Sequence, residues 1–330
     1  MRDELHSLPR RRFLAAVTAA LAAAPASGAS AAPASARIAI TFDLEMSRNF
    51  PTWEQTHWDY EKGNLDDATK RYAVEAARRV KAHGGVLHFF LVGRALEQEN
   101  ADWLKQLLAD GHPIGNHTYD HVNVKATKPA DIQFRFLRAP WLIEGRAPAE
   151  VVRDNIRQCS AAMRSRLGID PVGFRTPGGF RDGLADRPDV QAMLRELGFT
   201  WCSSKYPGHK IGAAGEKPDG EVFASIVCAQ AGAQPFRYAG GLVEIPMSPV
   251  SDIGAFRTGR WKLDWFLEAI RRAVESAIQQ RAVFDFIAHP SCLGVVDPEC
   301  KTVELICELV KQAGRRAVLT DLNSIAQRIA

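Results

Sequence analysis

The stretch His112-Pro-Ile-Gly-Asn-His-Thr-Tyr-Asp-His121 ends a short apolar run with two histidines, His117 and His121, four positions apart. The apolar run is typical of a buried strand, which would fix the backbone that carries both imidazoles. Two imidazoles this close in sequence can bind one divalent metal ion, although a solvated turn that carries two histidines by chance is the alternative. The stretch therefore predicts a strand that ends at a candidate metal site.

A second apolar run, Ile38-Ala-Ile-Thr-Phe-Asp-Leu-Glu45, ends in two carboxylates. Because residues i and i+2 of a strand face the same side, Asp43 and Glu45 can both face one cavity. Two histidines and one acid make three protein ligands and leave a coordination position for water, which is the arrangement of catalytic zinc sites. The spacing alone does not decide which acid binds the metal.

The rest of the chain alternates apolar runs with amphipathic segments. Strands are predicted at Ile38–Phe42, Val86–Leu91, Pro113–Gly115, Val172–Phe174, Thr200–Cys202, Leu242–Ile245, Val283–Ala288 and Ala317–Leu319. Helices are predicted at Asp67–Ala82, Ala101–Ala109, Ala149–Leu167, Val190–Leu197, Trp261–Gln280 and Val303–Ala313. This alternation predicts an α/β fold, a parallel sheet closed into a barrel with helices outside. Arg175 and His289 also follow predicted strands, at the edge where such barrels place active sites.

The first 36 residues have the composition of an export signal. Arg10-Arg-Arg-Phe-Leu14 precedes an uncharged, alanine-rich stretch to residue 24, and small residues continue to residue 36. This order indicates a twin-arginine signal peptide, with a disordered basic tail as the alternative. The apolar stretch is too short to span a bilayer. We therefore expect a mature start between Ala29 and Arg37, passage through the Tat translocase, a periplasmic or secreted location, and no stable membrane anchor after cleavage.

Charge and cysteine content narrow the function further. Residues 1–36 hold four arginines and two acids, so the formal charge falls from +4 to +2 without them, and no basic run predicts a nucleic-acid partner. Residues 37–330 suit one large α/β domain. The six cysteines lack metal-ligand spacing; Cys292 and Cys300 flank a short loop and are the best candidates for a disulfide, with buried free thiols as the alternative.

Four stretches, in this order, resemble the polysaccharide deacetylase family, the NodB-homology carbohydrate esterases of family 4. They are Thr41-Phe-Asp-Leu-Glu45, Gly115-Asn-His-Thr-Tyr-Asp-His121, Phe174-Arg-Thr-Pro-Gly-Gly179 and Val283-Phe-Asp-Phe-Ile-Ala-His-Pro290. The similarity covers nearly all of residues 38–320. It implies an irregular (β/α)7-8 barrel of the NodB-homology type and metal-dependent hydrolysis of N-acetyl groups on the amino sugars of a glycan. Some members of the family act on other amide or cyclic-amide bonds.

The resemblance implies that His117 and His121 are metal ligands. By similarity to members with the wider acid spacing, Asp43 is the catalytic base and Glu45 the third ligand, although the two acids could exchange roles. Such a donor set suits Zn²⁺, and Co²⁺, Ni²⁺, Fe²⁺ or Mn²⁺ fit with little change. The metal would polarise the acetamide carbonyl and acidify a water, whose proton Asp43 would take.

Three further roles complete this mechanism. A backbone N–H near Tyr119 would stabilise the oxyanion together with the metal. His289 would protonate the leaving amine, and Arg175 would orient and charge-balance Asp43. The family's fourth motif usually supplies an acid that tunes the catalytic histidine, but residues 199–205 hold no carboxylate. Asp252 or Asp285 would then serve instead, or His289 is tuned in another way.

The third motif also departs from the family pattern, at Thr176 and Gly178, and Ala288 stands where a larger aliphatic residue commonly lines the acetyl pocket. These departures leave open a hydrolase of another C–N bond, in a cyclic or small amide. The missing fourth-motif acid leaves open a catalytically inactive glycan-binding relative.

Two long loops are expected to shape the substrate site. Residues 46–65 carry Phe50, Trp53, Trp58 and Tyr60, and residues 122–148 carry Phe134, Phe136 and Trp141. Their rings could stack on sugars, with packing beneath the loops as the alternative. The candidate substrate contacts are Tyr119, Trp53, Trp58, Pro177 and Gly178. Residues 212–220 and 246–260 are predicted to be mobile cover.

Overall fold

The computed structural model describes residues 35–46 and 62–329, and in these residues nine strands form one sheet. The strands are β1 (Ala36–Leu44), β2 (Leu87–Leu91), β3 (Ile114–Asn116), β4 (Gly173–Phe180), β5 (Trp201–Lys205), β6 (Phe236–Arg237), β7 (Val243–Glu244), β8 (Val283–Ala288) and β9 (Ala317–Leu319). Their order is β6-β7-β5-β4-β3-β2-β1-β8, and β9 pairs with the start of β1. All neighbours are parallel except β6 and β7.

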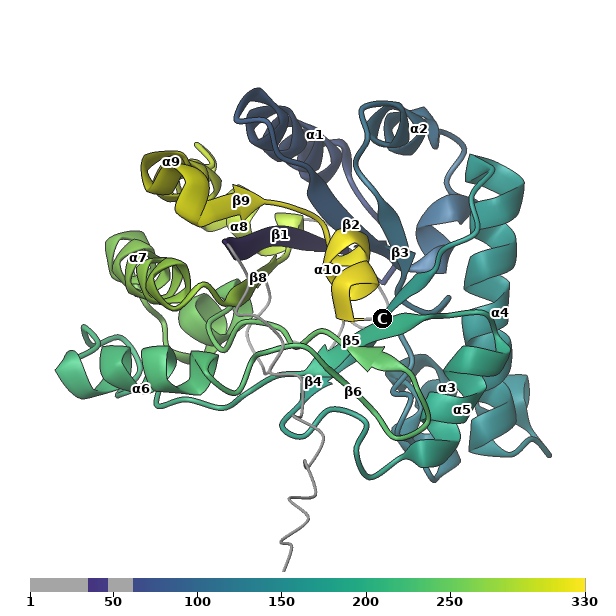
Figure 1. Ribbon diagram of the computed structural model, residues 1–330. Coiled ribbons are helices and arrows are strands. Elements are labelled where there is room, and N and C mark those ends of the chain that lie inside the picture. The colour runs from purple at the N-terminus through teal and green to yellow at the C-terminus, as the bar shows by residue number, and fades with distance from the viewer. Residues whose placement is uncertain (1–34, 47–61, 330) are drawn as a thin grey trace, which may run out of the picture. The chain divides into compact units, whose positions relative to one another are not determined.

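The sheet curls into an irregular barrel. The strands at the two ends of this order, β6 and β8, do not pair with each other, but the N–H of Ser248, just after β7, donates to the carbonyl of Asp285 in β8 at 2.9 Å. Helices surround the strands (Figure 1), as expected for parallel strands joined by crossover connections. The predicted α/β barrel is confirmed.

The predicted helices all form, with shifts at their ends, and further helices are present. The helices that were predicted are α1 (Asp67–Ala82), α2 (Asp102–Ala109), α4 (Pro148–Leu167), α5 (Pro188–Glu196), α7 (Leu263–Gln280) and α9 (Lys301–Ala313). The helices that were not predicted from the sequence are α3 (Phe134–Arg138), α6 (Gly220–Gln230), α8 (Pro290–Val296) and α10 (Leu322–Ile329). Asp219 starts α6 by accepting the N–H of Val222 with its side chain, and an aspartate at this position is a typical N-cap.

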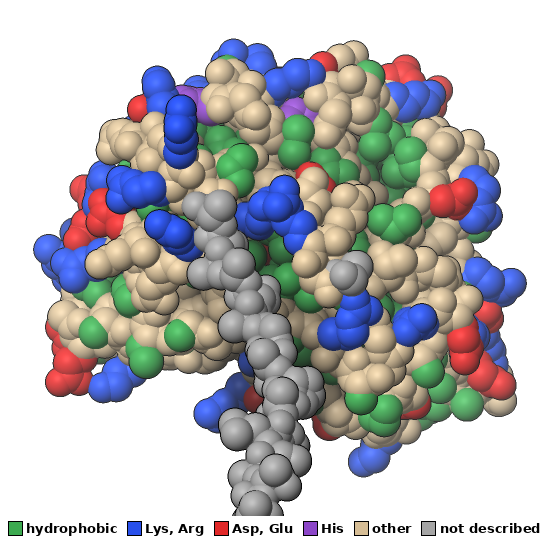
Figure 2. Space-filling model, in the orientation of Figure 1, with side chains coloured by type: hydrophobic (Ala, Val, Ile, Leu, Met, Phe, Trp, Pro, Cys, Tyr) green, Lys and Arg blue, Asp and Glu red, His purple; other side chains and the backbone are tan. Residues whose placement is uncertain are grey.

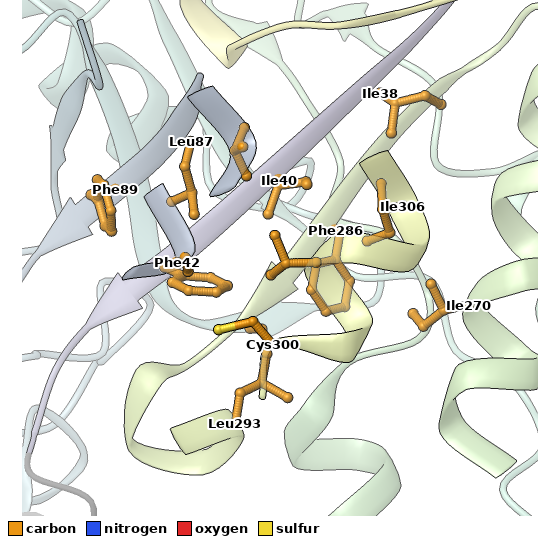
Figure 3. Packing of buried hydrophobic residues seen from close by; sticks show 14 of the residues in the cluster. Ile38, Ile40, Phe42, Leu87, Phe89, Ile270, Phe286, Leu293, Cys300 and Ile306 are labelled. Atoms are coloured by element: carbon orange, nitrogen blue, oxygen red, sulfur yellow. The ribbon is translucent and has the colours of Figure 1, made fainter. Parts of the chain in front are cut away.

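Two layers of buried residues hold the barrel together. On the outer side of β1, Ile38, Ile40 and Phe42 pack toward Phe286 of β8 and Ile306 of α9 (Figure 3). This layer follows the period of two along the strand.

The inner layer closes one end of the barrel. There Leu322 and Ile325 of α10 pack against Ala39, Phe90 and Trp201 inside the strands. Figure 1 shows α10 lying across the sheet. Helix α10 therefore occupies the interior of the barrel near the end at which the strands begin.

The described residues also test the predicted disulfide. Cys292 and Cys300 are free buried thiols, so the predicted disulfide is wrong and its alternative holds. Residues 253–258 form a π-helical turn beside a buried Asp252. On the face shown in Figure 2, lysines and arginines are scattered among acidic and apolar side chains. The export signal, Trp53, Trp58, Phe50 and Tyr60 lie outside the described residues.

Candidate metal centre and active site

Two carboxylates stand at the end of β1, inside the mouth of the barrel. Asp43 and Glu45 are two residues apart, so the strand turns both toward the cavity, and they are 3% and 7% exposed. One Asp43 oxygen, Oδ1, accepts from Arg175 Nη1 at 3.0 Å. Its other oxygen, Oδ2, lies 3.8 Å from His117 Nε2 and 4.0 Å from His289 Nε2. Asp43 therefore has one oxygen bound by the Arg175 guanidinium and one oxygen turned toward the two histidines.

The segment after β3 presents two histidines on a strained backbone. Thr118 and His121 both have a φ of +61°, which costs free energy in residues other than glycine. Hydrogen bonds impose this path: Asn116 Oδ1 accepts the Thr118 N–H, and Asn155 Oδ1 accepts that of Asp120, both at 2.8 Å. This backbone path brings the ring of His121 close to that of His117, with 5.1 Å between the ring centres.

Glu45 and the two histidines converge on one point. Glu45 Oε1 lies 3.0 Å from His117 Nε2 and 2.9 Å from His121 Nε2. The three donor atoms lie within 4.8 Å of one another, close enough for one ion. Asp43, Glu45 and His289 form a second such group within the described residues, sharing Glu45.

The hydrogen bonds of this cluster fit a bound cation. His117 Nδ1 lies 2.9 Å from the carbonyl oxygen of Arg175, which only accepts, so the ring proton resides on Nδ1. Nε2 of a neutral His117 then turns a lone pair toward a carboxylate oxygen. Burial lowers the pKa of His121 to about 4, so this ring also offers a lone pair at pH 7. These three atoms could hold a cation, which would remove the repulsion between them, and imidazole with carboxylate is a donor set for Zn²⁺ and similar ions.

Arg175 is buried at the centre of the barrel and ties its strands together. Besides Asp43, its guanidinium donates to Thr41 Oγ1 at 2.8 Å and to Asp285 Oδ2, and it lies 4.2 Å from the centre of the Phe90 ring. Thr41 in turn donates to the other Asp285 oxygen at 2.8 Å. Asp285 thus neutralises the charge of Arg175. None of these hydrogen bonds joins Asp285 to His289.

His289 is held by a different acid. Its Nδ1 lies 3.0 Å from Asp252 Oδ1, and its backbone N–H donates to Asp252 Oδ2 at 2.7 Å. Its Nε2 points into the site, 3.5 Å from Glu45 Oε1. Burial lowers the pKa of His289, but the carboxylates of Asp252 and Glu45 outweigh burial and raise it well above its usual value. Of the two acids left open by the sequence, the structure places Asp252 on His289.

One charged member of the site, Lys62, was not predicted from the sequence. The Lys62 ammonium donates to Glu45 Oε2, and its side chain is 1% exposed. Burial raises the pKa of Glu45, but His121, Lys62 and His289 outweigh burial and hold it well below its usual value. Glu45 is therefore a carboxylate. Lys62 follows an aromatic-rich stretch of sequence, and its sequence neighbours carry no signal that would have singled it out.

A cavity of about 220 Å³ opens over these groups. Its lining includes Asp43, Glu45, Lys62, His121, Thr176, Gly178, Gly179, Tyr206, Met247, Ser251, Ile253, Arg257, Ile287 and His289. Gly178 belongs to this lining, and Pro177 lines a neighbouring groove. The structure does not bring Tyr119 into the cavity, because its N–H donates to Asn155 and its hydroxyl to Glu97.

Fold and site together define an α/β barrel whose strand ends carry a two-histidine, one-carboxylate centre beside an arginine-bound aspartate and an aspartate-bound histidine. Residues 64–201 match the family model for polysaccharide deacetylase. Over these residues the match confirms the resemblance to the polysaccharide deacetylase family that the motifs indicate. His117, His121 and Arg175 fall within the matched segment, whereas Asp43 and His289 lie outside it.

Individual relatives are distant. The chain is 26% identical over 124 residues to a chitooligosaccharide deacetylase of Azorhizobium caulinodans, a match that covers 36% of this chain and 57% of the relative. The fold resembles a probable polysaccharide deacetylase from Pseudomonas aeruginosa PAO1, with TM-score 0.60, 14% identity and 88% and 89% of the two chains covered. It also resembles Puue allantoinase, with TM-score 0.56, 13% identity and 90% and 91% covered. These two likenesses concern the fold alone.

Proposed function

We propose that this chain is an exported, metal-dependent hydrolase that removes N-acetyl groups from the amino sugars of a polysaccharide. The observation that carries the proposal is the convergence of Glu45, His117 and His121 beside Asp43 and His289. The family match supports deacetylation of a glycan. Glu45, His117 and His121 would hold the ion, with Zn²⁺ as the best fit and Co²⁺, Ni²⁺, Fe²⁺ or Mn²⁺ as alternatives.

The geometry supports one division of roles. A divalent cation bound there would polarise the acyl oxygen and make a nearby water more acidic. Asp43, with Oδ1 held by Arg175, keeps Oδ2 turned to the cavity, where it can accept the water's proton. Glu45 lies nearer to both histidines than Asp43 does, which favours Glu45 as the ligand and Asp43 as the base.

His289 is suited to the opposite task. Amine leaving groups are strongly basic and need a proton as the C–N bond breaks. Because Asp252 stabilises the protonated imidazole, His289 can hold that proton on Nε2 and deliver it to the nitrogen. Asp252 supplies the acid whose absence from residues 199–205 suggested an inactive relative, so that hypothesis loses its support.

Grooves on both sides of the cavity favour a polymeric substrate. His121 and Gly178 also line a groove of about 390 Å³ that continues past Gln133, Phe134 and Leu137. On another side, Tyr206 is shared with a groove of about 530 Å³ lined by Arg181, His209 and Lys210, among others. A chain of sugars could therefore extend beyond the residue that is deacetylated.

A second candidate function is hydrolysis of a small or cyclic amide. The catalytic cavity itself, at about 220 Å³, is small enough to favour it. The test is to incubate the purified protein, loaded with Zn²⁺ or Co²⁺, with N-acetylglucosamine oligomers and with cyclic amides. Acetate release supports the first function, and ring opening without acetate supports the second. No acetate at any metal loading would refute the deacetylase.

Export rests on Arg10-Arg-Arg-Phe-Leu14 and the uncharged stretch after it. Among the described residues, none of the helices has the length and apolar character needed to cross a bilayer. Mass spectrometry of the protein recovered from periplasm and medium tests the proposal. A mature N-terminus between Ala29 and Arg37 is expected, and an exported chain that retains Met1 would contradict cleavage.

A further inference from the structure

Lys62 is the one lysine in the lining of the catalytic cavity, as far as the described residues show. Its ammonium donates to Glu45 Oε2, and almost none of its side chain reaches solvent. Burying an ammonium costs free energy unless an opposite charge compensates it. A buried lysine on a carboxylate at the mouth of an active site therefore suggests a role in the site.

The backbone fixes Lys62 in this position. The N–H of the next residue, Gly63, donates to the backbone carbonyl of Glu45 at 2.5 Å. Gly63 has a φ of +87°, and a Cβ there would lie 2.3 Å from Arg94 Cβ. Only glycine fits so close to Arg94. Lys62 is thus anchored beside Glu45 although 17 positions separate the two residues.

The two oxygens of Glu45 face different partners. Oε1 faces His117 Nε2 and His121 Nε2, at 3.0 and 2.9 Å. Oε2 faces the Lys62 ammonium. A carboxylate can bind a cation through one oxygen or through both. Binding through both would fill a further coordination position, whereas a hydrolytic centre needs positions open for water and substrate.

We propose that Lys62 is a positioning residue that occupies Glu45 Oε2, so that Glu45 offers a cation Oε1 alone. This inference rests on the proposed function, in which Glu45 is a metal ligand. The ammonium also repels a divalent ion across the carboxylate, so an open coordination position comes with weaker cation binding. Lys62 therefore sets both the coordination number of the centre and its affinity.

The test compares three variants of the full chain with wild type. Lys62→Met keeps the length and apolar stem of the side chain but removes the charge and the donor groups. Lys62→Arg keeps both. Lys125→Met is the matched control, since Lys125 pairs with Asp186 and does not line the cavity. Each protein is titrated with Co²⁺, and its visible absorption, which weakens as the coordination number of Co²⁺ rises, is recorded alongside calorimetric affinities.

We expect Lys62→Met to bind Co²⁺ at least about tenfold more tightly, with weaker absorption per ion, because Glu45 can then bind through both oxygens. Lys62→Arg and Lys125→Met should resemble wild type. A Lys62→Met protein with the affinity and spectrum of wild type would overturn the role of Lys62 alone. Wild-type protein that binds no Co²⁺ would overturn the metal centre itself, and this role with it.

Discussion

His117 and His289 stand at the mouth of the same barrel, and both direct Nε2 toward Glu45 Oε1, at 3.0 and 3.5 Å. They differ in the partner of the other ring nitrogen. Nδ1 of His117 meets the carbonyl of Arg175, whereas Nδ1 of His289 meets the carboxylate of Asp252. A carbonyl fixes the tautomer without adding a full charge, and a carboxylate stabilises the protonated ring. In the proposed function, the partner of Nδ1 thus suits His117 to bind a cation and His289 to donate a proton.

The largest effect is expected when His117, the proposed metal ligand, is removed. We expect His117→Ala to weaken Zn²⁺ binding by more than about 100-fold, because loss of a direct ligand costs more than loss of a residue that only hydrogen-bonds to a ligand. Acetate release should also be abolished. Elemental analysis of the purified protein measures bound metal. His83→Gln is the control, because His83 pairs with Glu304 away from the cavity. A His117→Ala protein that still carries one ion per chain would place the metal elsewhere.

Removal of the acid should leave the metal in place. We expect His289→Gln to keep its Zn²⁺ and to lose about 10²- to 10⁴-fold in kcat on an N-acetyl substrate, the range typical of general acid catalysis. An aryl acetate ester, whose leaving group needs no proton, should be hydrolysed at a rate much closer to that of wild type. Equal losses on both substrates would argue against a role as proton donor.

Substitution of Asp252, whose carboxylate contacts His289 Nδ1, should have a smaller and more specific effect. Asp252→Asn removes the charge that raises the pKa of His289, so the ring should lose its proton at lower pH. Because the protonated form is the active acid, the alkaline limb of the kcat profile should move to lower pH. We expect kcat at pH 8 to fall about 10- to 100-fold with metal content unchanged.

Asp297→Asn is the matched control for this pH shift. Asp297 is as deeply buried as Asp252, but it accepts the N–H groups of Lys301 and Thr302 at the start of α9. Its loss should lower the free energy of unfolding and leave the pH profile in place. A profile that moves equally in both variants would show a general effect of burial rather than the Asp252–His289 pair.

The residues around the proposed metal ligands could be predicted from the sequence better than the residues around His289. Strand ends and the i, i+2 rule are local signals, so the sequence alone could place Asp43, Glu45, His117 and Arg175 on one rim. Asp252 precedes His289 by 37 residues, in a segment without regular periodicity. Its place depends on how the chain returns across the barrel, which sequence spacing does not encode.

Local sequence patterns also do not show when a backbone group has a hydrogen-bond partner in a distant part of the chain. A backbone N–H near Tyr119 was expected to face an oxyanion, and the N–H of Tyr119 itself donates to Asn155 of α4. That contact joins residues 36 positions apart and follows from the packing of α4 on the segment after β3. Helix α10 was missed for a related reason, since its eight residues gain their stability by filling the barrel interior rather than from length.

The smallest expected effect lies in the groove beyond the ligand histidine. Phe134 is half-buried and lines this groove, whereas Trp141, 69% exposed, lines neither the groove nor the cavity. An aromatic contact of about 0.5–1.5 kcal/mol corresponds to a roughly two- to tenfold change. We expect Phe134→Ala to raise KM by that factor on a long N-acetylglucosamine oligomer and to leave KM on a disaccharide unchanged. Trp141→Ala should alter neither value. A rise on both substrates would mean that Phe134 supports the cavity itself, and no rise on either would count against a polymer that follows this groove.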